Sequence, residues 1–267
     1  MKINENTLLQ LCNAAITAGN RVLDFYELDT EIIYKKDESP LTKADLDSNK
    51  ILLSSISKIT PNVPILSEEK FIGWDKRKNW KKYWLIDPLD GTKEFIKKNG
   101  EFTINIALIE YNQPVLGIIF APALGCLFFS KKNSGSYKIY TKNNIDTFNK
   151  SEKISVKHTN KEKIIVLGSR SHSNTTFDNW VKNKFTNFEI IEKGSSLKFC
   201  EIAEGKADIY PRFGPTSEWD IAAGHIILLE SGGKLKSIDN KDLVYNTKED
   251  ILNPYFFAYA DDALIKN

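Results

Sequence analysis

Near the start of the chain, apolar residues recur every three or four positions, which is the spacing of one face of an α-helix. In the first such stretch they are Leu8, Leu11, Cys12, Ala15, Ala18, Val22 and Phe25. A second stretch runs from Asp45 to Ile59 and stops before Pro61, which cannot continue a helix. The pattern therefore predicts two helices, with a short β segment at 31–35 and a polar loop at 36–42 between them.

The middle of the chain changes to the period-two pattern of β-strands. Residues 102–111 alternate well, and further short strands follow at hairpin distances, at 115–121, 126–130 and 136–140. The apolar run 115–129 is shorter than the roughly 20 residues that a membrane-spanning helix needs, and two glycines and a proline interrupt it. We expect two buried strands joined by a turn there, and no integral membrane segment.

The later part of the chain alternates helix and strand. Strands are predicted at 163–167 and 188–191, and helices at 175–184, 196–204 and 219–231. A polar segment rich in Asn and Lys, 143–152, precedes them and is the expected boundary between two halves. This alternation is typical of the α/β fold class.

Composition and charge narrow the functional classes. The 267 residues include 41% hydrophobic residues, enough for a substantial core. Lys and Arg number 37 against 35 Asp and Glu, a net charge of +2, which argues against a general nucleic-acid binder. The three cysteines are scattered, and the N-terminal residues lack the apolar core of a signal peptide, so a reducing, cytoplasmic location is expected.

The strongest chemical signal is the segment 87–92 (DPLDGT), which directly follows an apolar strand. It places two carboxylates three residues apart in a turn stiffened by a proline. Such close acids repel one another unless a cation lies between them, and carboxylates with a turn carbonyl, here that of Leu89, are hard ligands of the kind Mg²⁺ takes. Gly91 allows close approach of the backbone to a ligand, and Thr92 can begin a helix whose free N–H groups suit a phosphate.

Other acids stand at similar places. Glu68 and Glu69 end a short predicted strand, while Asp45 and Asp220 each lie at the start of a predicted helix. An acid at a helix start is often only a cap. From spacing alone, these element ends either converge on one site with two metals or are ordinary caps.

Four motifs occur in an order that resembles a known family. They are 39–45 (SPLTKAD), 66–69 (LSEE), 84–92 (WLIDPLDGT) and 219–224 (WDIAAG). Together they resemble the inositol monophosphatase superfamily of lithium-sensitive, Mg²⁺-dependent phosphomonoesterases, over essentially the whole chain. Three further segments resemble its 3'(2'),5'-bisphosphate nucleotidase branch (CysQ): 168–172 (GSRSH), 194–200 (GSSLKFC) and 210–215 (YPRFGP).

The resemblance implies a layered αβαβα sugar-phosphatase fold of the α/β class, with an α+β first half at 1–150 and an α/β second half at 151–267. It also implies a set of metal ligands. Glu68, Asp87 and the Leu89 carbonyl would hold a first Mg²⁺ ion. Asp87, Asp90 and Asp220 would hold a second, with Asp87 bridging the two. Glu68 would also help with a weaker third ion.

It also implies a reaction, the hydrolysis of adenosine 3',5'-bisphosphate to AMP and phosphate by direct attack of a metal-activated water. Asp45 and Thr92 resemble the hydrogen-bonded pair that orients and deprotonates this water, with Glu68 as a further catalytic residue. The backbone N–H groups of Gly91 and Thr92 would bind the scissile phosphate.

The second phosphate of this substrate requires additional cations and donors. Substrate-binding residues implied by the resemblance are Arg170, Ser171, His172, Ser195, Ser196, Lys198 and Arg212, with Glu68, Leu89, Asp90, Gly91, Thr92 and Asp220 around the scissile group. From the sequence alone, each of three basic residues has a structural interpretation as well. Lys198 could lie on a solvated helix face, Arg212 could pack on an aromatic ring, and His172 could cap a helix.

Two other functions remain open. An inositol monophosphatase or a fructose-1,6-bisphosphatase-like sugar phosphatase would share the metal motifs, and a non-catalytic nucleotide- or metal-binding regulator would share the fold. The sequence has no Walker loop and no Rossmann glycine fingerprint, which excludes a kinase and a dehydrogenase.

The expected binding partner is the small nucleotide bisphosphate substrate. By resemblance, family members are often homodimers, and some associate peripherally with the inner membrane.

Overall fold

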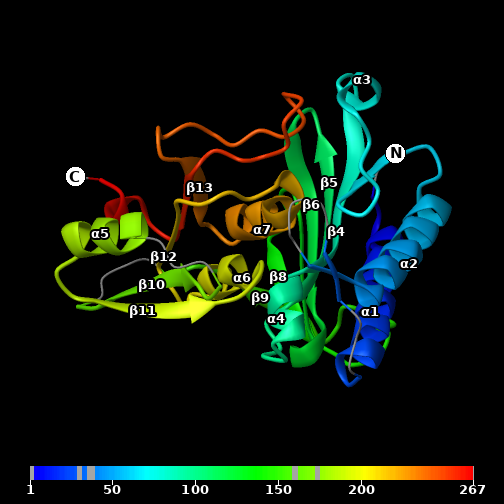
Figure 1. Ribbon diagram of the computed structural model, residues 1–267, viewed down its shortest axis with the longest axis horizontal. Helices are drawn as coiled ribbons and strands as arrows, with labels where there is room; N and C mark the ends of the chain where they lie inside the picture. The colour runs from blue at the N-terminus through cyan, green and yellow to red at the C-terminus, as the bar shows by residue number, and fades with distance from the viewer. Residues whose placement is uncertain (1–2, 29–31, 35–39, 158–161, 172–174, 267) are drawn as a thin grey trace.

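The computed structural model describes residues 3–28, 32–34, 40–157, 162–171 and 175–266. Within them, two mixed β-sheets and three helical layers alternate through the molecule (Figure 1). The order is helices, large sheet, helices, small sheet, helix, which confirms the predicted α/β class and the αβαβα layering. No helix in these ranges combines the length and apolar character needed to cross a membrane.

The large sheet has seven strands in the order β3-β4-β5-β6-β7-β8-β9. Only the β3–β4 pair is parallel; the others are antiparallel. The strands are β3 (Ile65–Ser67), β4 (Lys82–Asp90), β5 (Thr103–Glu110), β6 (Gln113–Ala121), β7 (Cys126–Lys131), β8 (Ser136–Tyr140) and β9 (Glu152–Ile154). The turn between β6 and β7 is a 3-10 helix, η1 (Pro122–Leu124), so the interrupted apolar run is the predicted strand pair.

Strand β4 is buried on both faces. Trp84 and Ile86 lie in the outer core, between the sheet and helices α1 (Glu5–Tyr26) and α2 (Lys43–Ile59). Alternation along the strand turns Tyr83 and Leu85 into the inner core, on the opposite face. The strand is thereby fixed from both sides, and its carboxyl end carries the acidic motif.

The small sheet has five strands in the order β11-β10-β12-β14-β13. They are β10 (Ile164–Ser169), β11 (Phe188–Lys193), β12 (Ile209–Arg212), β13 (Lys234–Ser237) and β14 (Phe256–Tyr259). Helices α6 (Leu197–Ala203) and α7 (Glu218–Glu230) lie between the two sheets, and α5 (Thr175–Lys184) covers the outer face of the small one (Figure 1). The inner core therefore contains residues from both halves of the chain.

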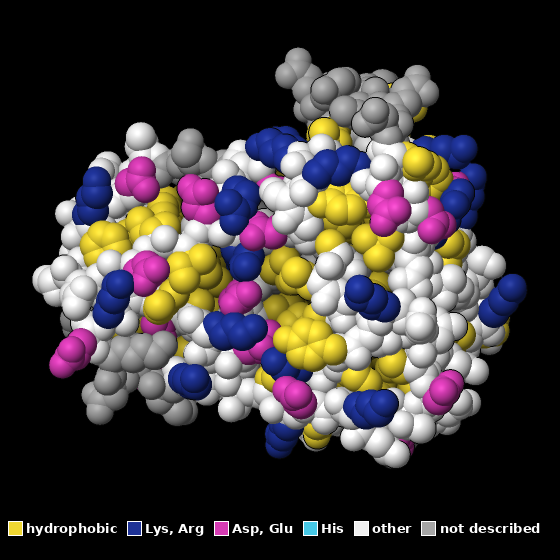
Figure 2. Space-filling model, turned by 90° about the horizontal axis from the view of Figure 1, so that it is seen from below, with side chains coloured by type: hydrophobic (Ala, Val, Ile, Leu, Met, Phe, Trp, Pro, Cys, Tyr) yellow, Lys and Arg dark blue, Asp and Glu magenta, His cyan; other side chains and the backbone are white. Residues whose placement is uncertain are grey.

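Short elements complete the chain. They are β1 (Ile32–Tyr34), which pairs with β2 (Pro40–Thr42), α3 (Trp74–Arg77), α4 (Thr92–Ile96) and η2 (Asp262–Leu264). Helix α4 begins at the predicted residue, directly after the acidic motif. Acidic and basic side chains lie side by side across the middle of one face of the molecule (Figure 2).

Candidate active site

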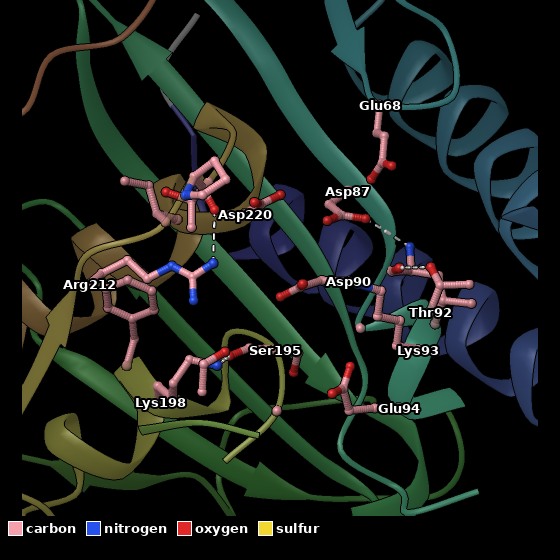
Figure 3. Close-up of a pocket in the computed structure, with 18 of the residues that line it drawn as sticks. Glu68, Asp87, Asp90, Thr92, Lys93, Glu94, Ser195, Lys198, Arg212 and Asp220 are labelled. Carbon is pink, nitrogen blue, oxygen red and sulfur yellow. Dashed lines mark hydrogen bonds between the residues drawn. The ribbon is translucent and has the colours of Figure 1, made fainter. Parts of the chain in front are cut away.

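A pocket of about 270 Å³ opens where the end of β4 and the start of α4 meet α6, β12 and the start of α7. It brings together most of the residues expected from the sequence (Figure 3). Those that line it are Glu68, Asp87, Leu89, Asp90, Gly91, Thr92, Ser195, Lys198, Arg212 and Asp220.

Four carboxylates from three segments turn into this pocket. Asp87 and Asp90 come from β4, Glu68 follows β3, and Asp220 lies in the first turn of α7 (Figure 3). Burial raises the pKa of Asp87 well above its ordinary value, and the charges of Glu68, Asp90 and Asp220 raise it further. Burial and the charges of Asp90 and Glu68 likewise raise the pKa of Asp220. The four acids are thus close enough to disfavour one another's ionised forms.

The donor set fits a hard divalent cation, because carboxylate and carbonyl oxygens are the ligands Mg²⁺ prefers. The Asp87 carboxylate also accepts the Leu89 N–H at 3.0 Å, which tightens the turn between the two acids. Across the described residues, no group of three or more His, Cys, Asp or Glu side chains stands in metal-holding geometry. We therefore assign metal ligands on the chemistry of the acids, not on a formed cage.

Asp45 and Thr92 are in contact, as the sequence predicts. Asp45 is buried at the start of α2, where its carboxylate accepts bonds from the Thr42 N–H at 2.8 Å and the Thr42 hydroxyl at 2.5 Å. The Thr92 hydroxyl lies 3.1 Å from the other Asp45 oxygen and 3.2 Å from the Leu89 carbonyl. Burial raises the pKa of Asp45 despite these bonds, which prepares the carboxylate to accept a proton.

Gly91 occupies a conformation that other residues rarely adopt, with φ of 88°. A Cβ there would stand 3.1 Å from the Glu101 carbonyl and 3.2 Å from the Ser195 side chain. The glycine thus lets the backbone between Asp90 and Thr92 turn tightly beside the second half of the chain.

Two cations approach the pocket from the second half. Lys198 is buried, and its Nζ donates to the Ser195 carbonyl at 2.7 Å and the Lys193 carbonyl at 3.0 Å. Arg212 donates from Nη2 to the Pro215 carbonyl at 2.8 Å (Figure 3). Arg212 Nε and Ser195 Oγ are buried and find no hydrogen-bond partner among the described residues, so two residues of the pocket lining each keep an unsatisfied polar atom.

Ser196 lies behind the pocket and supports Asp90. Its N–H and hydroxyl each lie 2.7 Å from Asp90 Oδ2, and the hydroxyl is also 2.8 Å from the Asp220 carbonyl. Asn105 on β5 donates to the Ser196 hydroxyl at 2.7 Å. Burial raises the pKa of Asp90, and the Ser196 and Asn105 bonds offset part of that rise.

Arg170 and Ser171 lie outside the pocket lining and bond to carboxylates of the first half. Arg170 forms a two-pronged pair with Glu101, at 2.7 and 3.0 Å, and Glu101 also accepts the Gly194 N–H at 2.8 Å. Burial raises the pKa of Glu101, but these bonds outweigh it and lower the pKa below its ordinary value. The Ser171 hydroxyl donates to Glu94 at 2.5 Å. His172 lies outside the described residues.

Sequence reasoning missed several members of the site. Lys93, Glu94, Ser169, Tyr210 and Thr216 also line the pocket. Lys93 and Glu94 directly follow the acidic motif 87–92, so their position in the sequence could have indicated that they line the pocket. Glu101 and Asn105 act through partners about ninety residues away, and nothing local in the sequence marks such contacts.

The chain belongs to the inositol monophosphatase family, whose sequence pattern it matches over residues 4–265. It is 40% identical to the 3'(2'),5'-bisphosphate nucleotidase CysQ of Salmonella typhimurium, over 93% of this chain and 98% of that one. Identity to CysQ of Buchnera aphidicola is 42%, covering 94% and 92% of the two chains. The crystal structure of CysQ from Bacteroides thetaiotaomicron superposes with a TM-score of 0.84 at 39% identity, covering 96% and 97%.

Proposed function

We propose that this protein is a 3'(2'),5'-bisphosphate nucleotidase that hydrolyses the 3'-phosphate of adenosine 3',5'-bisphosphate to AMP and phosphate. The observation that carries the proposal is a pocket with carboxylates on one side and two cations, Lys198 and Arg212, on the other. A substrate with two separate phosphates needs both sides: the carboxylates hold the metal ions at the scissile phosphate, and the cationic side chains bind the distal phosphate. Family membership and relatives named as this nucleotidase support the same substrate.

Activity depends on a divalent metal, in keeping with the family, and we assign the ions as follows. Glu68, Asp87 and the Leu89 carbonyl would hold one Mg²⁺, and Asp87, Asp90 and Asp220 would hold a second. Glu68 would also serve a weaker third ion. When bound, Mg²⁺ neutralises phosphate charge, lowers the pKa of water and stabilises the leaving oxygen.

The protein's own groups position the substrate and accept the proton. Thr92 links the attacking water to Asp45, whose raised pKa favours proton uptake. The backbone N–H groups of Gly91 and Thr92 hold the scissile phosphate in place. Water attacks the phosphorus directly, and its proton passes to Asp45 through the Thr92 hydroxyl. The 3'-oxygen departs with the electrons of the broken P–O bond and takes a proton from solvent water to give the 3'-hydroxyl of AMP, and Asp45 later returns its proton to solvent.

The two halves contribute different parts of this site. In our proposal, residues 1–150 supply most of the metal ligands, and residues 151–267 supply Asp220 and the groups that bind the distal phosphate. Lys198 and Arg212 bind it by charge, and Ser195 donates from its unpartnered hydroxyl. Ser196 supports Asp90, while Arg170 and Ser171 bond to Glu101 and Glu94 outside the pocket lining.

A substrate panel tests the proposal. Phosphate release is measured with adenosine 3',5'-bisphosphate, inositol 1-phosphate and fructose 1,6-bisphosphate, each with Mg²⁺ or with EDTA. We expect Mg²⁺-dependent release and the highest kcat/KM for the nucleotide. Asp90→Asn should abolish release while circular dichroism stays unchanged, and Asp239→Asn, at an exposed position, is the matched control.

Two results would contradict the proposal. A higher kcat/KM for inositol 1-phosphate would reassign the protein to the inositol monophosphatases. Nucleotide binding without any phosphate release would point to a regulator that has kept the fold.

A further inference from the structure

Helix α2 buries polar side chains on the face that it turns toward β4. Asp45, Ser48 and Asn49 are 2%, 0% and 7% exposed. Their i, i+3, i+4 spacing places them on one stripe, which Leu52 and Ile56 continue as ordinary core residues. A polar group in such a place is costly unless it is hydrogen-bonded, so the partners of these residues indicate what they do.

Ser48 holds the turn that carries the paired acids. Its hydroxyl donates to the Pro88 carbonyl at 2.7 Å, in a fully buried contact. Pro88 lies between Asp87 and Leu89, two of the assigned metal ligands. The bond therefore fixes the direction of one carbonyl of the turn, leaving the next, that of Leu89, beside the pocket and the Thr92 hydroxyl.

Asn49 holds the other acidic segment. Its side-chain oxygen accepts a bond from the Ser67 hydroxyl at 2.8 Å, and Ser67 is 0% exposed. Ser67 is the last residue of β3 and immediately precedes Glu68. The same hydroxyl oxygen also accepts the Glu69 N–H at 3.3 Å, so the contact anchors the start of the turn that carries Glu68.

We propose that Ser48 and Asn49 are positioning residues that set the spacing between the Glu68 segment and the 87–90 turn, and thereby the affinity for Mg²⁺. This inference rests on the proposed function, because it takes Glu68, Asp87 and the Leu89 carbonyl as metal ligands. One rigid helix holds both segments, and through Asp45 it also holds Thr92. Groups of this kind, which orient metal ligands without touching the ion, affect metal affinity by about 10- to 100-fold.

The test compares Ser48→Ala with Ser130→Ala. Ser130 is a matched control, because it is 1% exposed and donates to a backbone carbonyl, that of Gly135, in a hairpin that lines no part of the pocket. Titration calorimetry with Mg²⁺ alone measures the affinity, and thermal unfolding in EDTA measures stability. We expect Ser48→Ala to bind Mg²⁺ about tenfold more weakly or worse, and Ser130→Ala to bind it as the wild type does.

Calorimetry needs no substrate, so its outcome is separate from that of the substrate panel. Mg²⁺ affinity of Ser48→Ala within twofold of the control would overturn the inference, and so would a wild-type protein that binds no Mg²⁺. If Ser48→Ala fails to fold, Ser67→Ala, which removes the donor to Asn49, carries the same test. Weaker Mg²⁺ binding by that variant supports the inference, and unchanged binding overturns it.

Discussion

Lys198 illustrates how the pocket tunes single residues. Burial, with a smaller contribution from the charge of Arg212, lowers its pKa from 10.5 to about 8, although Asp90, Glu94 and Glu101 act in the opposite direction. The side chain therefore carries its charge at neutral pH and loses it under mildly alkaline conditions.

This shift predicts a pH dependence of substrate binding. Below pH 8 Lys198 is protonated and attracts the distal phosphate, and above pH 8 it becomes neutral, so KM for adenosine 3',5'-bisphosphate should rise with pH. Lys198→Arg keeps its charge, so the alkaline rise should be absent in that variant. Steady-state KM measured from about pH 7 to about pH 9.5 checks this, and an identical rise in both proteins would refute it.

At the same scale, the sequence reveals only those site residues that are near one another along the chain. The segment 87–92 was readable because its acids, glycine and threonine are consecutive. The contact between Asp45 and Thr92 was reached through the family resemblance and is present in the structure. By contrast, the pairing of Arg170 with Glu101 depends on how the halves meet, and no local pattern encodes that.

At the scale of elements, α7 shows how closely the site depends on packing. Its first turn carries Asp220, and its body lies against β6 with Gly117 beneath it. A Cβ at Gly117 would lie 2.5 Å from the Ala223 carbonyl oxygen and 2.5 Å from the Ile226 side chain. The helix can therefore sit at its present height above the sheet only because residue 117 has no side chain.

Gly117→Ala should lift α7 and displace Asp220. Overpacking of this kind costs about 1–3 kcal/mol in the free energy of unfolding, and Mg²⁺ should also bind more weakly. Gly73→Ala is the control, because nothing lies within 4 Å of a Cβ there. Denaturant unfolding measures both variants; equal stability of the two would show that α7 adjusts without cost.

Helices and strands with a clear hydrophobic period were predicted well, and short strands without such a period were not. The predicted helix 175–184 coincides with α5, and 219–231 differs from α7 by one residue at each end. Strand β12 escaped prediction because it contains Pro211, a residue that normally argues against a strand inside a sheet. Its neighbour β14 is only four residues long, too short for a periodic pattern.

At the scale of the whole molecule, a net charge of +2 conceals a strongly uneven distribution. Glu68, Asp87, Asp90 and Asp220 share one pocket, and their mutual repulsion opposes folding unless cations separate them. Stability of the protein should therefore depend on the metal as well as on the core.

Removal of Mg²⁺ should lower the melting temperature. A ligand that binds only the folded state at 100 times its Kd stabilises it by about 2.7 kcal/mol. We expect scanning calorimetry to show a higher Tm with saturating Mg²⁺ than with EDTA, with sodium chloride at matched ionic strength as the control. Asp220→Asn should show a smaller increase; an equal Tm with Mg²⁺ and with EDTA in the wild type would contradict the expectation.

The position of β14 has a consequence for synthesis on the ribosome. Strand β14 is the last strand among the described residues, yet it pairs with both β12 and β13, so those two strands have no common neighbour until residues 256–259 emerge. All strands of the large sheet lie before residue 155 and can pair earlier. Until residues 218–230 have emerged, the large sheet presents its inner apolar face without α7, so the nascent chain is most exposed to aggregation before this helix and its Asp220 are in place.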